Sequence, residues 1–230
     1  MVETPMIEIY ADGAGLAEIA ELAHDPRISG FTTNPSLARK AGVTDYATFA
    51  REALKAAAGK PVSIEVLADD VAGMVRQAED ICAISRYAVV KIPVMNTAGE
   101  DTGEVIRYLA RQKIAINVTA IMTRDQIRSV MRSLDGAEAI VSIFAGRIRD
   151  FGYDALPTMR YAVRHRGAAK VLWASTREIW NVYEAEQAGC DIITVPHEML
   201  PKLRMRGKDL TELSLETVRQ FHQDGKGYSL

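Results

Sequence analysis

The sequence of 230 residues has little of what marks several large classes of protein. Its two cysteines, Cys82 and Cys190, lie far apart and outside any CxxC motif, so neither a disulfide framework nor a cysteine-based metal site is expected. Its four histidines are scattered without ligand spacing. A formal net charge of -2 gives no basic footprint for nucleic acid, and no uncharged apolar run is long enough to span a bilayer. These absences predict a cytoplasmic globular protein that binds no metal, nucleic acid or membrane.

Short apolar segments alternate with longer amphipathic ones along the whole chain. The apolar segments are rich in Val and Ile and nearly free of polar residues on either face, which is typical of strands buried in a parallel sheet. About eight are present: Ile7–Asp12, Gly30–Asn34, Pro61–Val66, Ala88–Val94, Ile114–Thr119, Ala139–Gly146, Val171–Ser175 and Asp191–Pro196. The segments between them predict helices at Leu16–Ala23, Tyr46–Ala58, Val71–Ile84, Gly103–Arg111, Arg124–Leu134, Leu156–His165 and Glu178–Ala188.

Strict strand–helix alternation leaves two α/β architectures, a doubly wound open sheet and a closed (β/α)8 TIM barrel. A strand count near eight and the lack of a GxGxxG loop after the first strand favour the barrel. Barrels of this kind commonly have about 250 residues, so residues 1–230 are expected to form one domain. Two further segments, His197–Met205 and Leu213–His222, predict extra C-terminal helices after the eighth strand.

Polar residues stand near the carboxyl ends of seven predicted strands, where barrel enzymes build their active sites. Residues i and i+2 of a strand share a face, so Glu65 is expected beside Ser63, and Thr119 beside Asn117. A hydrogen-bonded polar network in the barrel mouth, without catalysis, would also account for this pattern.

Lys91 is the most informative of these residues, because it lies in the middle of the apolar segment Val-Val-Lys-Ile-Pro. Lysine is rarely buried, and burial favours the neutral amine that can attack a ketone carbonyl. A structural ion pair with Asp12 or Glu65 is the alternative. The same two carboxylates are candidates for the proton transfers of Schiff-base chemistry.

Two arginines, Arg147 and Arg177, follow the sixth and seventh strands and fall on the active-site side. Guanidinium groups suit phosphate oxygens, and the segment Ser175-Thr176-Arg177 opens a predicted helix whose free N–H groups favour an anion. Ser175 could instead be a plain helix cap, because Ser175-x-x-Glu178 fits a capping box.

The residues resemble, in type and order, the transaldolase family and the smaller fructose-6-phosphate aldolases within it. The matching segments are Ala11-Asp12, Gly30-Phe31-Thr32-Thr33-Asn34-Pro35-Ser36, Ser63-Ile64-Glu65-Val66, Val89-Val90-Lys91-Ile92-Pro93, Asn117-Val118-Thr119, Ser142-Ile143-Phe144-Ala145-Gly146-Arg147-Ile148 and Ala174-Ser175-Thr176-Arg177. They span most of the chain.

The resemblance implies a role for each matching residue. Lys91 is similar to the lysine that forms the Schiff base with the donor ketose, and Asp12 to the acid/base residue that takes the proton of the hydroxyl beside the cleaved bond. Glu65 and Thr119 resemble the pair that positions a catalytic water. The remaining matches imply ligands of the donor hydroxyls and of the substrate phosphate: Asn34, Asn117 and Ser142 for the hydroxyls, and Arg147, Ser175 and Arg177 for the phosphate.

Two residues favour a transferase over an aldolase. Fructose-6-phosphate aldolases resemble this chain in size but carry Gln at the position of Glu65 and Tyr at that of Phe144. The expected activity is therefore transfer of a dihydroxyacetone unit from a ketose phosphate to an aldehyde acceptor, without cofactor, in pentose phosphate metabolism and by a homo-oligomer. An aldolase that releases free dihydroxyacetone and a catalytically silent sugar-phosphate-binding barrel remain alternatives.

The chain also departs from the family pattern near the expected site. Gly13 follows Asp12 where the family has Thr, Ile143 replaces a proline, and Trp173 stands at a position normally occupied by Gly or Ala. Trp173 is two residues before Ser175, so strand alternation places its indole on the face of Ser175. We therefore expect Trp173 to reshape the sugar pocket.

Overall fold

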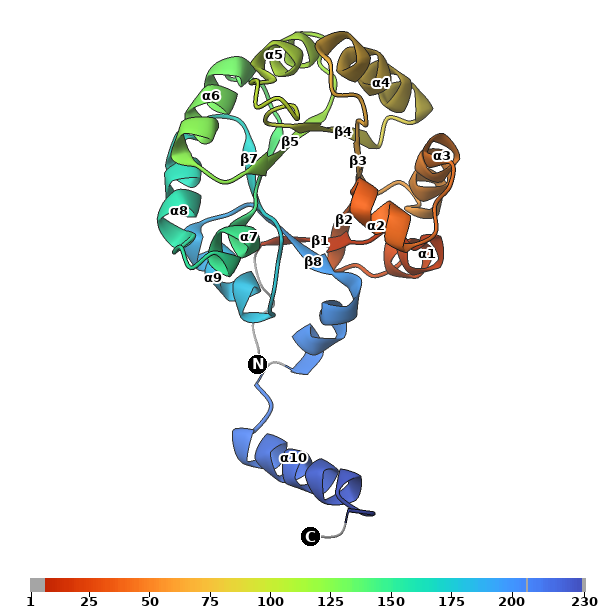
Figure 1. Cartoon of the computed structure of the whole chain (residues 1–230), viewed down its shortest axis with the longest axis vertical. Helices are drawn as coiled ribbons and strands as arrows, with labels where there is room; N and C mark the ends of the chain where they lie inside the picture. The colour runs from red at the N-terminus through yellow and green to blue at the C-terminus, as the bar shows by residue number, and fades with distance from the viewer. Residues whose placement is uncertain (1–6, 206, 229–230) are drawn as a thin grey trace.

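Eight parallel strands close into a barrel in the order in which they occur in the chain (Figure 1). The structure is a computed structural model that describes residues 7–205 and 207–228. The strands are β1 (Glu8–Asp12), β2 (Ile28–Thr32), β3 (Val62–Glu65), β4 (Ala88–Pro93), β5 (Ile116–Ile121), β6 (Ile140–Ile143), β7 (Lys170–Trp173) and β8 (Ile192–Pro196). Parallel pairing of β8 with β1 closes the ring. The predicted (β/α)8 barrel is confirmed.

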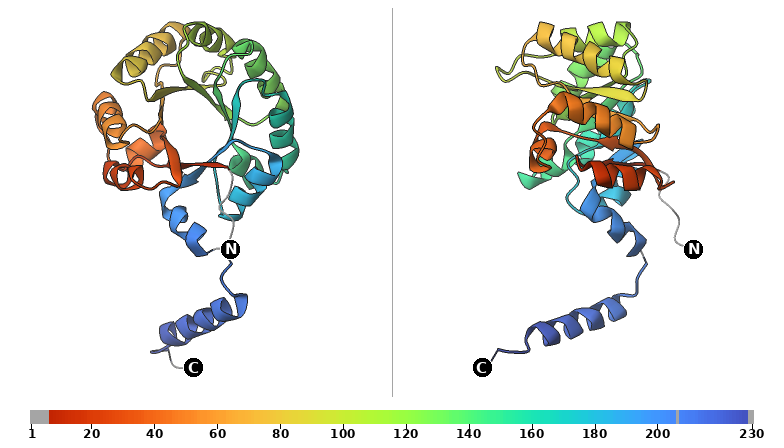
Figure 2. Two further views of the ribbon diagram at one scale, coloured as in Figure 1. Left: turned by 180° about the vertical axis from the view of Figure 1, so that it is seen from behind. Right: turned by 90° about the vertical axis from the view of Figure 1, so that its right-hand side faces the viewer.

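Helices surround the barrel on its outside (Figures 1 and 2). They are α1 (Leu16–Ala23), α2 (Pro35–Lys40), α3 (Tyr46–Ala56), α4 (Val71–Ile84), α5 (Gly103–Arg111), α6 (Arg124–Leu134), α7 (Ala145–Asp150), α8 (Leu156–His165) and α9 (Trp180–Ala188), followed by the 3-10 helix η1 (His197–Met205) and by α10 (Leu210–Asp224). Local signals fix several starts. Asp70 caps α4 through Gly73, and Thr123 forms a capping box with Gln126 at the start of α6.

Several boundaries differ from the sequence prediction. The short helix α2 was not expected, although Pro35 at its first position and the Asn34 side chain, which accepts the Leu37 N–H at 2.9 Å, are ordinary start signals. The apolar segment Ala139–Gly146 is a strand only to Ile143, and its last two residues begin α7. Apolar side chains suit a buried helix turn as well as a strand, so periodicity alone did not separate the two.

The barrel contains two apolar cores. A small one fills the barrel interior with side chains from five strands, namely Tyr10, Val89, Ile140, Leu172 and Ile192. The larger one lies between the outer faces of the strands and the helices. Each fully buried aliphatic side chain contributes roughly 1.5–3 kcal/mol to stability. The interior core fills the barrel toward the amino-terminal ends of the strands. The polar residues further along each strand therefore lie at the carboxyl-terminal mouth of the barrel.

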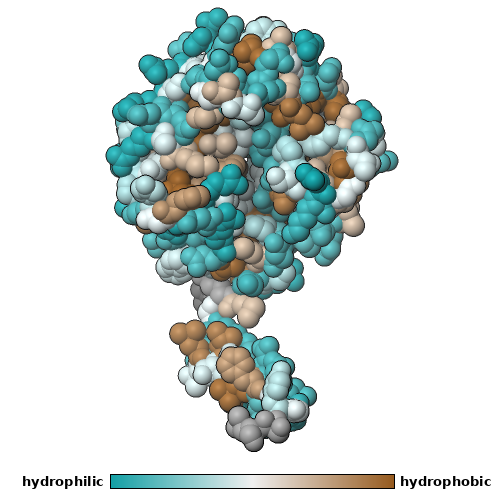
Figure 3. All heavy atoms as spheres, in the orientation of Figure 1, coloured by the Kyte–Doolittle hydropathy of each residue, from teal (hydrophilic) through white to brown (hydrophobic). Residues whose placement is uncertain are grey.

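Helix α10 stands apart from the barrel (Figure 2). None of its described residues is buried, and Leu210, Val218 and Phe221 are among the exposed large hydrophobic residues. Figure 3 shows apolar atoms gathered along one side of this helix. Among the described residues, no helix is long and apolar enough to cross a membrane.

Candidate active site

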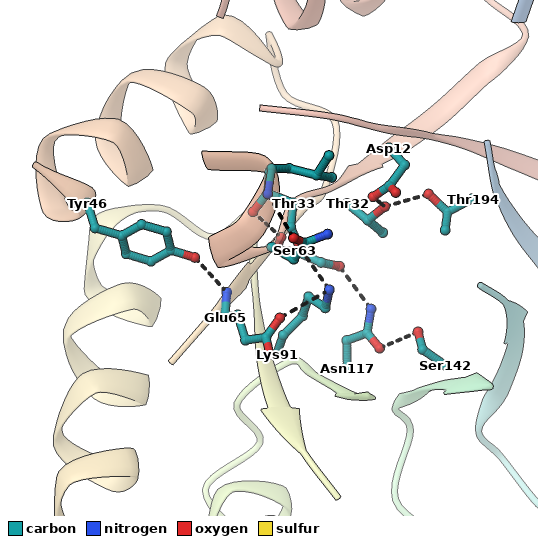
Figure 4. Close-up of polar contacts among 12 residues, drawn as sticks. Asp12, Thr32, Thr33, Tyr46, Ser63, Glu65, Lys91, Asn117, Ser142 and Thr194 are labelled. Carbon is teal, nitrogen blue, oxygen red and sulfur yellow. Dashed lines mark hydrogen bonds and ion pairs between the residues drawn. The ribbon is translucent and has the colours of Figure 1, made fainter. Parts of the chain in front are cut away.

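Strand register brings the inward polar side chains of β1 to β6 together at the barrel mouth (Figure 4). Glu65 of β3 pairs with Lys91 of β4, and Lys91 pairs in turn with Asn117 of β5. Neighbouring strands lie about 4.7–4.9 Å apart, so paired residues with the same orientation have side chains within reach of one another. Three residues that are far apart in sequence therefore form one row.

Lys91 is nearly enclosed, with 5% of its surface exposed. Its Nζ donates to the carbonyl oxygen of Thr33 at 2.8 Å and lies 3.4 Å from Oε2 of Glu65. The sequence left open a nucleophile or a structural ion pair with Asp12 or Glu65. The ion pair with Glu65 is present, and the amine is held at the barrel mouth, where a ligand carbonyl could reach it.

Asp12 lies at the end of β1 and accepts a hydrogen bond from the Thr32 hydroxyl at 2.7 Å. The Thr32 hydroxyl is also hydrogen-bonded to that of Thr194 on β8. Burial raises the pKa of the Asp12 carboxyl, while the charge of Lys91 and the bond from Thr32 act in the opposite direction. A carboxylate whose pKa is raised in this way is a stronger base, which is the property that a proton acceptor needs.

Hydrogen-bonded side chains line the wall opposite Asp12. The Ser142 hydroxyl donates to Oδ1 of Asn117 at 2.7 Å, and Nδ2 of Asn117 lies 3.2 Å from the Ser63 hydroxyl. These three residues are buried. The Thr119 hydroxyl is buried too, but it has no hydrogen-bond partner among the described residues. Buried polar groups are nearly always paired, so this hydroxyl is available to a ligand or a water.

A second cluster lies where β6 and β7 end. The Arg147 guanidinium is 5.2 Å from the centre of the Phe144 ring, and Arg177 forms an ion pair with Asp150 of α7 at 2.5 Å. Ser175 has a left-handed backbone, with φ +63°. Its carbonyl oxygen approaches Gly146 so closely that a Cβ at that position would lie 1.6 Å away. Gly146 therefore allows the two loops that carry Arg147 and Arg177 to meet.

Two sequence expectations for this cluster are wrong. The segment Ser175-Thr176-Arg177 does not open α9, and Ser175 does not cap it, because that helix begins at Trp180 and its N-cap is Ile179. The indole of Trp173, which strand alternation placed on the face of Ser175 near the sugar pocket, does not lie there. It is fully buried in the outer core and lies 5.4 Å from the Arg149 guanidinium. The left-handed turn at Ser175 ends the strand alternation on which the prediction rested.

Sequence reasoning also left out residues that the structure brings to the site. The Thr32 hydroxyl donates to Asp12 and is itself hydrogen-bonded to that of Thr194, and strand parity was a usable signal for both. Asn34, expected as a ligand of the substrate, uses its Oδ1 to cap α2. Tyr46, at the start of α3, contacts the backbone of Glu65, and no sequence pattern pointed to it.

The fold and this mouth define a (β/α)8 barrel with a polar site built around one enclosed lysine. The family described as Transaldolase/Fructose-6-phosphate aldolase matches residues 9–229. A probable transaldolase of Roseiflexus sp. (strain RS-1) is 36% identical, over 96% of this chain and 98% of its own. Another, of Desulforudis audaxviator (strain MP104C), is 34% identical over 95% of this chain and 97% of its own. The chain therefore belongs to the transaldolase/fructose-6-phosphate aldolase family, and it is an enzyme of the transaldolase type.

Solved structures of other proteins share the fold. A 3-hexulose-6-phosphate synthase has a TM-score of 0.59 and 14% identity, covering 83% of this chain and 89% of its own. Orotidine 5'-monophosphate decarboxylase from Metallosphaera sedula has a TM-score of 0.57 and 12% identity, covering 95% of this chain and 99% of its own. At this identity the likeness concerns the barrel alone.

Proposed function

We propose that the enzyme transfers a dihydroxyacetone unit from a ketose phosphate to an aldehyde acceptor through a Schiff base on Lys91. The observation that carries this proposal is the enclosed Nζ of Lys91, 2.8 Å from the Thr33 carbonyl and 3.4 Å from Glu65. A nucleophile that is enclosed but held at an open strand end suits attack on a ligand carbonyl.

In the proposed reaction the Lys91 amine adds to the donor carbonyl, and loss of water gives the protonated imine. Asp12 then takes the proton of the hydroxyl beside the breaking carbon–carbon bond, and the aldehyde product leaves. The electron pair of that bond remains on the lysine-bound fragment as an enamine. The enamine attacks the acceptor aldehyde while Asp12 returns its proton to the new hydroxyl, and water then hydrolyses the imine to release the new ketose and the Lys91 amine. Glu65 and the Thr119 hydroxyl, which has no partner in the part of the chain that the structure describes, hold that water.

The remaining predicted residues are proposed as substrate ligands. Asn117 and Ser142 bind donor hydroxyls together with Asn34, and Phe144 forms an apolar wall. Arg147, Ser175 and Arg177 hold the phosphate, which is supported by the close contact of their two loops at Gly146. Trp173 is not part of this proposal, because it lies in the outer core.

Borohydride trapping tests the nucleophile. Fructose 6-phosphate and borohydride are expected to leave a stable adduct whose mass maps to Lys91, and Lys91→Met abolishes it. Lys60 provides a matched control, because its Nζ also donates to a backbone carbonyl, that of Asp25 at 2.7 Å, but at the opposite end of the barrel. The Lys60→Met variant should form the borohydride-trapped adduct on Lys91 to the same extent as the unaltered protein. Absence of an adduct with every ketose phosphate tested would refute the nucleophile and support the alternative, a catalytically silent barrel that binds sugar phosphates.

Omitting the acceptor separates transfer from aldol cleavage. Phe144 stands against the interior core and has no hydroxyl for proton transfer to a released ketone fragment. We therefore expect fructose 6-phosphate alone to release glyceraldehyde 3-phosphate slowly, and an added aldose phosphate to accelerate it. Rapid release without acceptor would identify an aldolase instead.

The proposal extends to the assembly and setting of the enzyme. We propose one domain over residues 1–230 that forms a homo-oligomer, with the exposed apolar side of α10 (Leu210, Leu213, Val218 and Phe221) covered by another copy. Sedimentation of Phe221→Asp should show a smaller species than the unaltered protein, and an unchanged species would contradict this assembly. The free thiols Cys82 and Cys190 suit the reducing cytoplasm, and the reaction suits pentose phosphate metabolism.

A further inference from the structure

The hydrogen-bond ladder between β2 and β3 changes partners next to Lys91. The Phe31 N–H donates to the Pro61 carbonyl at 2.8 Å, and the Thr33 N–H donates to the Ser63 carbonyl at 3.0 Å. In a regular parallel ladder the next bond would run from the Glu65 N–H to the Thr33 carbonyl. At this position both groups bond elsewhere.

The Thr33 carbonyl accepts from Nζ of Lys91 at 2.8 Å. The Glu65 N–H donates to the hydroxyl of Tyr46 at 3.3 Å (Figure 4). The Tyr46 hydroxyl thus takes the place of a backbone carbonyl. A buried N–H without an acceptor costs roughly 1–3 kcal/mol, so without this hydroxyl the Glu65 N–H would turn back to the Thr33 carbonyl.

Tyr46 is held firmly in this role. It is the first residue of α3, which Asp45 caps through Thr48. Its ring packs against that of the buried Phe49, with ring centres 5.7 Å apart. Burial raises the pKa of Tyr46 to about 12, so the phenol stays neutral and its oxygen can accept this bond at ordinary pH.

We propose that Tyr46 is a positioning residue for the reaction: its hydroxyl accepts the Glu65 N–H and thereby leaves the Thr33 carbonyl free to orient the Lys91 amine. Tyr46 acts on Lys91 through Glu65, whose N–H its hydroxyl accepts, and through Thr33, whose side chain also interacts with that hydroxyl. This inference rests on the proposed role of Lys91 as the nucleophile.

Tyr46→Phe tests the inference, because it removes only the accepting oxygen. We expect the first-order rate of borohydride-trapped adduct formation with fructose 6-phosphate to fall about ten- to a hundredfold, as is typical for a misplaced reacting group. The KM for the donor should change less than about twofold, because the substrate contacts are unaltered. Tyr87→Phe is the matched control. It removes another hydrogen-bonded phenol, which accepts from Arg86 at 2.6 Å. Tyr87 directly precedes the first residue of β4, at the amino-terminal end of the barrel.

The outcomes separate the two proposals. No adduct with unaltered protein would defeat the nucleophile role itself. An adduct that forms in Tyr46→Phe at the unaltered rate would overturn the positioning role alone. Equal rate losses in Tyr46→Phe and Tyr87→Phe, accompanied by equal falls in melting temperature, would also overturn it, because they would indicate general destabilisation. A selective rate loss with an unchanged melting temperature supports it.

Discussion

Replacing Thr32 with valine tests the electrostatics of Asp12 with almost no change in shape. The Thr32 hydroxyl donates to Oδ1 of Asp12 at 2.7 Å, and Thr32 is buried, with 2% of its surface exposed. A hydrogen bond to a charged group contributes about 1.5–3 kcal/mol. The bond favours the carboxylate, so its loss raises the pKa of Asp12 above its already raised position.

The sign and size of the effect on catalysis follow from this. If Asp12 must be ionised to accept the sugar proton, the acid limb of the kcat/KM profile moves to higher pH in Thr32→Val. At a fixed pH on that limb, 1.5–3 kcal/mol corresponds to a loss of about ten- to a hundredfold. At high pH, where Asp12 is ionised in both proteins, the two rates converge.

The assay is donor cleavage coupled to reduction of the aldehyde product, measured across the acid limb. Thr194→Val is the control, because Thr194 is hydrogen-bonded to the Thr32 hydroxyl, and its replacement leaves the donor to Asp12 in place. It should leave the acid limb in place. A pH-independent rate loss in Thr32→Val, with no movement of the limb, would refute Asp12 as the base that this hydroxyl tunes.

Three further predictions test burial, packing and charge. Because burial raises the pKa of Asp12 above its ordinary 3.8, its ionisation destabilises the fold at neutral pH. Asp12→Asn should therefore raise the melting temperature at pH 7, by about 2–4 °C per kcal/mol, and the gain should shrink as the pH falls toward 3.8; a pH-independent gain would contradict this reasoning. Trp173→Ala should cost about 3–5 kcal/mol of stability in denaturant unfolding and leave donor preference unchanged, whereas an altered preference would return Trp173 to the site. Asp150→Asn frees Arg177 from a partly exposed ion pair worth about 0–1 kcal/mol, so the KM of phosphorylated donors should fall up to about fivefold and that of free dihydroxyacetone should not. A rise in KM would mean that Asp150 holds Arg177 in its binding position.

The sequence by itself determined the barrel and the inward direction of its central polar residues. Backbone geometry fixes alternation within a strand, so Lys91 and Glu65 face inward wherever those strands pair. Helix starts such as Asp70 and Thr123 were also readable, because capping acts within a single turn. The proposed role of Lys91 as the nucleophile needed the family resemblance in addition to burial.

Only the tertiary structure decided the contacts that depend on two distant segments. Thr194 reaches Thr32 across 162 residues, and Tyr46 comes to Glu65 from a helix outside the barrel. Trp173 was misplaced by sequence reasoning for a related reason. Its predicted alternation with Ser175 fails because the backbone of Ser175 is left-handed, with φ +63°. Local sequence specifies the faces of a strand, but where the strand ends and which neighbour supplies the next hydrogen bond are settled by the closed barrel.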